Sequence, residues 1–261
     1  MPTHGTPWEM YVRTVLGQGL VVVTTLGLVY LLVWKLGARV LAARQRSRPV
    51  SGRQLRHELR HTVVTVLLGA GYATAVAVLY RAGLTHLSTD ASEWSPLSLV
   101  ATVAGLILLN DLWFYGCHRL LHRPWLFRHV HAVHHRSVHV NPFTSYSFHG
   151  VEALLLSAWL LPLVMTVPLY LPVFGVVQVL GTANNVMSHL GYELLPRGLL
   201  RVPGLRWINT ATFHHLHHTR YHGNYGLFSR VWDRLFGTEL PGYEEAFLER
   251  RSNPPSAPPE A

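Results

Sequence analysis

Histidine is concentrated in the second half of this 261-residue chain in a way that points to metal chemistry. Fourteen of the 18 histidines lie between His118 and His222, and Glu152 and Glu193 are the only acidic residues within those limits. Neutral imidazole is the commonest metal ligand among side chains, and protonated rings this close together would repel one another. The composition therefore predicts that a metal holds many of these rings neutral.

Three short motifs repeat a spacing that suits two metal ions. One places two histidines four residues apart, and two copies of His-x-x-His-His supply three each; together they contain His118, His122, His131, His134, His135, His214, His217 and His218. Residues three or four positions apart share one helix face, so two rings of a motif can reach one ion and the adjacent ring a second. Eight ligands are too many for one ion of ordinary coordination number, and we expect two ions.

Other polar residues are expected around this set. Asp111 lies two helical turns before His118 at the inner end of an apolar run, where an acid is costly, and we expect it to accept the free ring N–H of a ligand. His189 ends another apolar stretch on the same side and is predicted as a ninth ligand. His149 is expected to be supporting or structural. The remaining histidines of the region, which are expected not to bind metal, are His129, His139, His215 and His222. Of the histidines outside the ligand set, His149 and His222 are the two for which metal binding stays open.

The overall composition indicates a membrane protein. Hydrophobic residues make up 49% of the chain and charged residues 13%, against roughly 25% charged residues in an average soluble domain. The net charge of +9 lies beside long apolar runs, which favours positive loops flanking membrane spans and argues against nucleic acid as the partner. Cys117 is the only cysteine, so an intrachain disulfide and a metal-binding thiolate cluster are both excluded.

Long apolar runs predict an all-α integral membrane bundle of four or five membrane helices. A helix that crosses a bilayer needs about 20 apolar residues. Residues 12–34, 62–80 and 97–109 supply three runs, the last of which continues into the first histidine motif. Residues 153–192 contain no Asp, Glu, Lys or Arg, and the prolines in the middle of this stretch predict a helical hairpin that crosses fully or partway.

The distribution of basic residues predicts the side of the membrane on which the histidines lie. Residues 35–60 hold eight Lys or Arg against Glu58 alone, whereas residues 81–96 hold one Arg against two acids. The positive-inside rule places the first of these segments in the cytoplasm. Alternating spans then bring every dense histidine motif to the cytoplasmic face, where we expect a helical cap to hold the metals.

The motifs resemble those of the fatty acid hydroxylase/sterol desaturase superfamily. The segment "DLWFYGCHRLLH" is similar to its Asp-x-x-x-Tyr-x-x-His-Arg-x-x-His pattern. The second histidine motif is followed, as in that family, by an Asn and by His-x-x-Glu, here Asn141, His149 and Glu152. The third is followed by Asn-Tyr-Gly and Trp-Asp-x-x-Phe-Gly-Thr, which begin at Asn224 and Trp232. One departure is Gly150, where many members carry proline. The resemblance covers about residues 98–238.

This resemblance implies two iron ions that use O₂ to attack an unactivated C–H bond of a lipid. Members hydroxylate or desaturate fatty acyl chains, sterols or carotenoids. It also implies supporting roles for Asp111, Arg119 and Glu152, and packing or capping roles for Asn224, Tyr225, Trp232 and Asp233. The chain carries no dinucleotide fingerprint, haem-attachment motif or thiolate cluster, so we expect electrons to come from a separate donor of the reductase, ferredoxin or cytochrome type.

We expect three regions and keep two other functions open. Residues 1–96 should form the N-terminal membrane helices with their basic loop, residues 97–240 the catalytic domain, and residues 241–261 a disordered, Pro-rich tail. A membrane zinc hydrolase would need a carboxylate general base among the ligands, as in His-Glu-x-x-His, and no motif contains one. A metal carrier or sensor would need a polar path, yet the spans lack repeated intramembrane acids.

Overall fold

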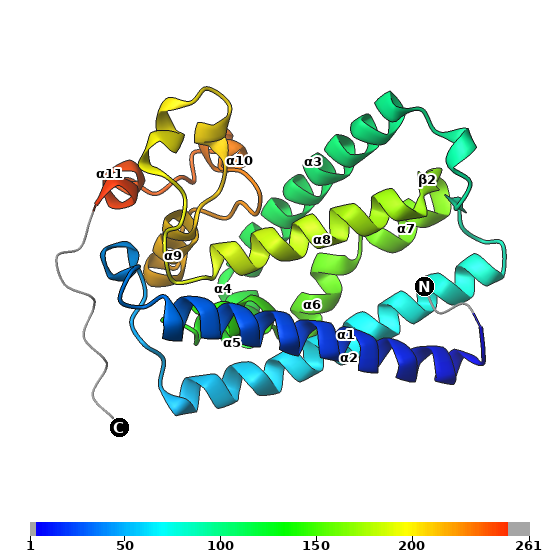
Figure 1. Cartoon of the computed structure of the whole chain (residues 1–261), viewed down its shortest axis with the longest axis horizontal. Coiled ribbons are helices and arrows are strands. Elements are labelled where there is room, and N and C mark those ends of the chain that lie inside the picture. Colours follow the sequence, from blue (N-terminus) through cyan, green and yellow to red (C-terminus); the bar gives the residue numbers. More distant parts are fainter. Residues whose placement is uncertain (1–3, 250–261) are drawn as a thin grey trace.

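The structure, a computed structural model, describes residues 4–249 and is built almost entirely from helices. Figure 1 shows long helices that run side by side and a compact group of short helices, the cap, at one end of them. In chain order the elements are α1 (Pro7–Val29), η1 (Tyr30–Leu36), η2 (Ala42–Arg44), α2 (Gly52–Arg81), β1 (Leu87–Ser88), η3 (Ala91–Glu93), α3 (Pro96–Leu121), α4 (Pro124–Leu126), η4 (Phe127–His131), α5 (Ala132–His135), η5 (Pro142–Tyr146), α6 (Gly150–Ser157), α7 (Leu160–Thr166), β2 (Leu169–Tyr170), α8 (Leu171–Ser188), η6 (Arg197–Arg201), η7 (Leu205–Trp207), α9 (Ala211–Arg220), α10 (Val231–Leu235) and α11 (Tyr243–Leu248).

Three helices are long and apolar enough to cross a membrane: α1 continued by η1 (Pro7–Leu36), α2 (Gly52–Arg81) and α3 (Pro96–Leu121). They contain the three runs predicted from the sequence, and the all-α membrane bundle is confirmed. Two of them extend well beyond the apolar run. Helix α2 begins ten residues before the predicted span, where the Ser51 side chain accepts the backbone N–H of Gln54. A Ser at this position satisfies a backbone donor that the first helical turn leaves free. Part of the basic loop is therefore helical.

The long uncharged stretch forms two helical arms. Helices α6 and α7 make one arm and α8 the other, and the break between them contains Pro168. At this turn β2 pairs in parallel with β1, with Leu87 opposite Leu169. Buried apolar side chains from α2, α3, α7 and α8 form the largest core cluster around it. Only three helices of the described residues meet the length and composition of a full span, so complete crossing by the arms stays a prediction.

Helix η1 and the loop that follows it are joined by hydrogen bonds to the segment after α8. The Trp34 indole N–H donates to the carbonyl of Leu190 at 2.9 Å, and the backbone N–H groups of Arg46 and Ser47 donate to the carbonyl of Gly191. Gly191 has φ +77, and a Cβ there would lie 2.5 Å from the Trp34 ring and 2.7 Å from the carbonyl oxygen of Val140. Only glycine permits this close approach of three chain segments.

The C-terminal part of the described chain differs from the predicted disordered tail. Residues 243–248 form α11, and Tyr243 and Phe247 are buried against Phe213 of α9 and Leu199 of η6. The prediction was wrong for this segment because its two aromatic side chains complete the core of the cap. The Pro-rich residues 252–261, on which the expectation of disorder rested, lie outside the described residues.

Candidate metal centre

Nine histidines converge in the cap in two groups. The first, which we call the five-histidine group, contains His118, His122, His131, His135 and His217; the second, the four-histidine group, contains His134, His189, His214 and His218. Within each group the ligand nitrogens all lie within 4.8 Å of one another. The structure thus brings together every histidine that the sequence singled out as a ligand.

Each group receives its rings from several helices. His118 lies in the last turn of α3 and His122 caps its end, while His189 caps the end of α8. The second motif lies on η4 and α5, and the third on α9. In both of these motifs the two histidines four residues apart enter one group, and the middle histidine, three residues after the first, enters the other. One helical turn thus spans both groups, as the spacing predicted.

Hydrogen bonds to backbone carbonyls fix which ring nitrogen is free in four of the nine histidines. The Nδ1–H groups of His118, His134, His189 and His217 donate to the backbone carbonyls of Tyr225, Ser147, Asn185 and Gly223 at 2.7–3.2 Å. His131 Nδ1 is hydrogen-bonded to Glu152 Oε1 at 2.8 Å, and burial raises the pKa of that carboxyl well above its usual value. A carbonyl oxygen can only accept, so Nδ1 carries the proton and Nε2 keeps its lone pair for a ligand bond.

The free nitrogens approach one another in a way that suits a bound cation. His134 Nε2 and His189 Nε2 lie 3.2 Å apart, and both carry lone pairs because both Nδ1 atoms are donors. No hydrogen bond can join two such acceptors. Two nitrogens that bind one ion at right angles, each about 2.1 Å from it, lie about 3.0 Å apart. The pairs His189–His214 and His135–His217 meet at 2.9 and 3.0 Å. The donor set therefore fits metal ions.

Burial keeps these rings neutral. It lowers the pKa of His122 to about 2, with a further contribution from His118. Burial, together with the neighbouring rings, holds the pKa of the histidines in the second and third motifs well below the usual value; these are His131, His134, His135, His214, His217 and His218. A neutral imidazole is the form that binds metal, so the site is prepared for ligation at ordinary pH.

The acid beside the ligands is Glu152, and Asp111 has a different place from the one expected. Glu152 is buried in the first turn of α6 and is hydrogen-bonded to His131 Nδ1. Asp111 contacts none of the nine histidines. Its carboxylate accepts the backbone N–H groups of Phe228 and Ser229, the Ser229 hydroxyl and the Trp232 indole N–H. The expectation that Asp111 accepts a ligand's N–H was therefore wrong; it holds the chain after the third motif against α3.

Arg119 lies further from the rings than Glu152. Its side chain is exposed on α3 and donates to the Tyr115 hydroxyl at 3.3 Å. That hydroxyl contacts Thr238 Oγ1, which in turn donates to Asp233. Asp233 accepts the backbone N–H groups of Tyr225 and Gly226, next to the carbonyl that receives His118. Arg119 is therefore connected to the ligands by a series of hydrogen bonds that runs through the loop after the third motif.

Sequence reasoning overlooked Glu58 as a supporting residue. This side chain of α2 is fully buried and accepts hydrogen bonds from Asn141 Nδ2, Thr144 Oγ1 and Gln54 Nε2 at 2.8–3.0 Å. It thereby fixes the chain that follows the second motif to an N-terminal membrane helix. The available signal was its position as the single acid among eight basic residues.

The remaining histidines of the region lie outside both groups. His149 caps the start of α6, where its Nδ1 accepts the N–H of Val151. His222 is exposed and its ring contacts the carbonyl of Arg220. Neither these two nor His129, His139 and His215 offer an atom to either group.

A large cavity lies beside the four-histidine group on the membrane side. It has a volume of about 860 Å³ and is bounded by α1, α2, α6 and α8. Phe148 and Leu156 line both this cavity and the small space bounded by His118, His131, His134, His189 and His214. Val21 of α1 and Val179 of α8 also line the cavity, although they are 64% and 68% exposed. The cavity is thus open toward the membrane region between α1 and α8, and two side chains separate it from the histidines.

Comparison with known proteins agrees with this architecture. The family model described as fatty acid hydroxylase matches residues 103–238, just over half of the chain. The chain is 33% identical to the rice (Oryza sativa) very-long-chain aldehyde decarbonylase over 166 residues, 59% of this chain and 25% of the relative. It is 28% identical to Gallus gallus methylsterol monooxygenase 1 over 151 residues and 26% identical to Homo sapiens lathosterol oxidase over 189 residues. These matches cover 56% and 71% of this chain, and 50% and 61% of the relatives.

The fold and the two histidine groups define a helical membrane protein with a buried polyhistidine centre. With the family match, the chain belongs to the fatty acid hydroxylase/sterol desaturase superfamily. It spans between a quarter and about three fifths of the length of these relatives. No solved structure matches it.

Proposed function

We propose that this protein is a membrane-bound, non-haem di-iron oxygenase that hydroxylates or desaturates a lipid. The observation that carries the proposal is the convergence of nine neutral imidazoles, eight buried and one half-buried, in two groups at the end of an apolar cavity. The five-histidine group would hold one ion and the four-histidine group the other. Two irons bound there would reduce O₂ with electrons from a separate donor and thereby supply the oxidant for an unactivated C–H bond. Imidazole ligation suits iron as well as zinc.

The residues around the site have roles that follow from their contacts. The backbone carbonyls hold the Nδ1 protons of four rings and so direct their Nε2 lone pairs inward, and Glu152 is hydrogen-bonded to His131 Nδ1. Phe148 and Leu156 form the wall past which a lipid carbon must reach the four-histidine group. Phe148 lies against the His134 ring with a centroid distance of 4.8 Å. This apolar wall excludes bulk water from the place where the C–H bond reacts. The names of the relatives, which include a sterol monooxygenase and an aldehyde decarbonylase, support a lipid substrate.

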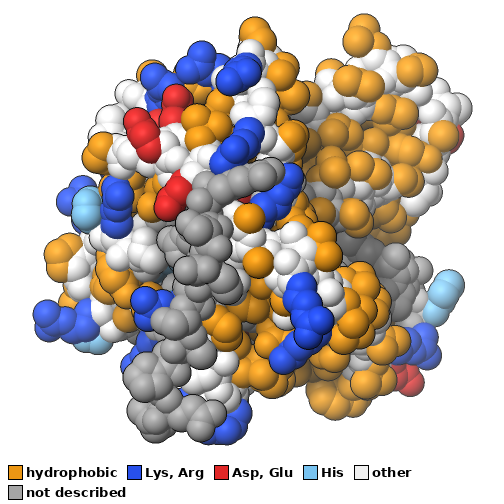
Figure 2. Space-filling model, turned by 60° about the vertical axis from the view of Figure 1, so that its left-hand side comes forward, with side chains coloured by type: hydrophobic (Ala, Val, Ile, Leu, Met, Phe, Trp, Pro, Cys, Tyr) orange, Lys and Arg blue, Asp and Glu red, His pale blue; other side chains and the backbone are white. Residues whose placement is uncertain are grey.

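The same proposal places the metal centre on the cytoplasmic face. Figure 2 shows Lys and Arg side chains over the cap side of the molecule and a mainly hydrophobic surface beside it. The positive-inside rule supports a cytoplasmic cap. A reporter fused after Ser47 and one after Thr238 should both report cytoplasm, and one inserted near Ser92 should report the opposite side. Opposite locations for the first two would contradict the shared face.

Metal analysis of the detergent-purified protein tests the proposed chemistry. We expect two irons per chain and O₂-dependent consumption of electrons that rises when a lipid extract is added. Stoichiometric zinc with ester hydrolysis would instead support a membrane zinc hydrolase. Bound metal that exchanges freely without any turnover would support a carrier or sensor. Comparison of the lipids of a host with and without the gene would identify the substrate.

A further inference from the structure

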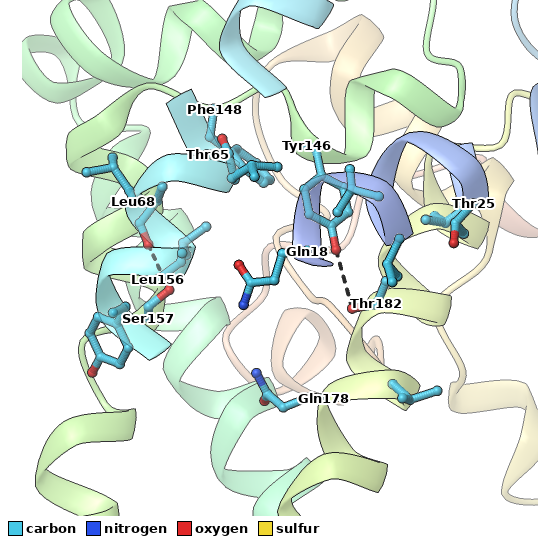
Figure 3. A pocket seen from close by; sticks show the side chains of 18 of the residues that line it. Gln18, Thr25, Thr65, Leu68, Tyr146, Phe148, Leu156, Ser157, Gln178 and Thr182 are labelled. Atoms are coloured by element: carbon cyan, nitrogen blue, oxygen red, sulfur yellow. Dashed lines mark hydrogen bonds between the residues drawn. The ribbon is translucent and has the colours of Figure 1, made fainter. Parts of the chain in front are cut away.

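Two side-chain amides project into the apolar cavity between α1 and α8. Gln18 comes from α1 and Gln178 from α8, and Figure 3 shows both side chains reaching into the central space from different walls. The two helices hold these residues at a similar depth. Gln18 precedes Trp34 by 16 residues and Gln178 precedes Leu190 by 12, and the Trp34 indole bonds the Leu190 carbonyl. The difference of four residues corresponds to about 6 Å along a helix.

These amides differ from the other glutamines of the chain in having no partner. Gln45 and Gln54, which lie outside the apolar runs, each donate a hydrogen bond, to Ser47 and to Glu58 and His139. Within residues 4–249 the side chains of Gln18 and Gln178 have none. Gln18 is half-buried and Gln178 is exposed; inside a bilayer no water reaches such an amide, and leaving it without a partner in an apolar environment costs about 1–3 kcal/mol by protein mutational data. Two such residues facing one cavity indicate that the partner comes from outside the chain.

The lining of the cavity defines the charge of that partner. Apart from its few amide, hydroxyl and phenol groups the wall is apolar, and it contains no Asp, Glu, Lys, Arg or His. A carboxylate or phosphate placed among these residues would lack a counter-charge, which is expensive within a membrane. An uncharged oxygen needs only hydrogen bonds, and the amide groups donate and accept them.

We propose that Gln18 and Gln178 together bind an uncharged oxygen of the lipid substrate, a hydroxyl or a ketone, remote from the carbon that reacts. Gln178 precedes His189 by 11 residues of α8, which corresponds to about 16 Å along the helix. The substrate is therefore a neutral lipid whose polar group lies about this far from the oxidised carbon, with an apolar body between them that passes Phe148 and Leu156. This inference rests on the proposed function for the reacting end, whereas the amide site itself can be tested by binding alone.

The test measures binding to the full-length, metal-loaded protein in detergent, without a reductant. Tritiated 1-hexadecanol serves as the probe, and unlabelled 1-hexadecanol, hexadecane and palmitate compete for it. Two neutral hydrogen bonds predict that the alcohol binds about tenfold more tightly than the alkane. Gln18→Leu and Gln178→Leu should each reduce this preference severalfold while leaving the affinity for hexadecane unchanged. The matched control is Thr14→Val, which removes a hydroxyl of α1 that bonds only the Met10 carbonyl and does not line the cavity; it should retain the full preference.

Several outcomes would overturn the amide site. They are the absence of saturable hexadecanol binding, equal affinity for alcohol and alkane, tightest binding of palmitate, and a preference that survives in both leucine variants. If the variants lower the thermal unfolding midpoint but keep the preference, the amides join helices and do not bind substrate. If the protein binds no iron but still prefers hexadecanol to hexadecane, the proposed function is wrong and the amide site is not affected.

Discussion

The two histidine groups use the same motifs in opposite ways. In the five-histidine group the second motif supplies the pair four residues apart, His131 and His135, and the third motif supplies the single ring of His217. In the four-histidine group the third motif supplies the pair, His214 and His218, and the second supplies only His134. What remains differs: α3 completes the first group with two rings, whereas α8 completes the second with His189 alone. Because each of these two motifs contributes to both groups, the two groups must assemble together, and the second contains fewer rings.

The largest effect is expected from replacing single rings of either group by a side chain that cannot bind metal. Replacing His118, His134 or His217 by Ala should lower bound metal and reduce turnover at least about a hundredfold, since each change removes a ligand from one group and the reaction needs both ions. The protein should remain in the membrane fraction. Metal analysis and lipid turnover measure this, with the exposed His129→Ala as the control that keeps both. Full metal and activity in all three variants would refute the di-metal assignment.

A matched pair of substitutions measures the difference between the groups directly. His189→Gln leaves three rings in the four-histidine group, whereas His122→Gln leaves four in the other. We expect about one metal per chain and severe loss of turnover for His189→Gln, and a smaller loss of both for His122→Gln, because His122 is the one half-buried ring of its group. Glutamine retains hydrogen bonding, so a packed, non-ligating His189 would tolerate the change. Equal metal loss in the two variants would show that the two groups do not differ in their tolerance to the loss of one ring.

The two buried acids near the motifs should separate in a similar test. Glu152→Gln replaces the carboxyl group that is hydrogen-bonded to His131 Nδ1, and loss of such a partner typically costs 10–100-fold in metal affinity or activity, so we expect about tenfold weaker metal binding. Asp111→Asn should leave metal affinity unchanged and lower the free energy of unfolding by about 1–3 kcal/mol, because it weakens contacts with Ser229 and Trp232. Chelator competition and thermal unfolding measure the two effects. A tenfold loss of metal affinity in Asp111→Asn would show that the acid acts on the ligands after all.

The smallest effect is the dependence of the metal-free protein on pH. The folded pKa values of the motif histidines lie below the usual value of 6.5, so the unfolded chain binds more protons than the folded chain when the pH falls below 6.5. Stability should therefore be constant from about pH 7 to 8 and decrease below pH 6.5, by up to about 1.4 kcal/mol per pH unit for each histidine involved. Thermal unfolding at pH 5.5 and 7.5 measures it. Burial raises the pKa of Glu152, which stabilises the folded state on acidification, so the comparison is made in Glu152→Gln; a midpoint that rises on acidification in this variant would mean that the rings are not buried neutral.

Contacts within the site could be predicted from the sequence where the residues lie close together in the chain, and not where they come from distant helices. The four-residue spacing of His118 and His122, or of His214 and His218, already defines a common helix face, so these rings could be grouped from the sequence. Which carboxylate contacts them depends on how distant helices pack. Asp111 was therefore predicted as the supporting acid, although its carboxylate accepts the backbone N–H of Phe228, after the third motif. Glu58 accepts a hydrogen bond from Asn141, which lies 83 residues further along the chain. Likewise, only packing against Phe213 shows that Tyr243 belongs to the cap.

The opening of the cavity between Val21 and Val179 has a consequence for how rates must be measured. A substrate that enters there never becomes a solute in water, so its effective concentration is its mole fraction in the bilayer. Diluting the membrane with an inert phospholipid, at constant amounts of protein and substrate, should slow the reaction in the same way as lowering a substrate's concentration slows a soluble enzyme. The amount of substrate that gives half of the maximal rate would then be expressed as a mole fraction in the bilayer and not as a concentration per litre.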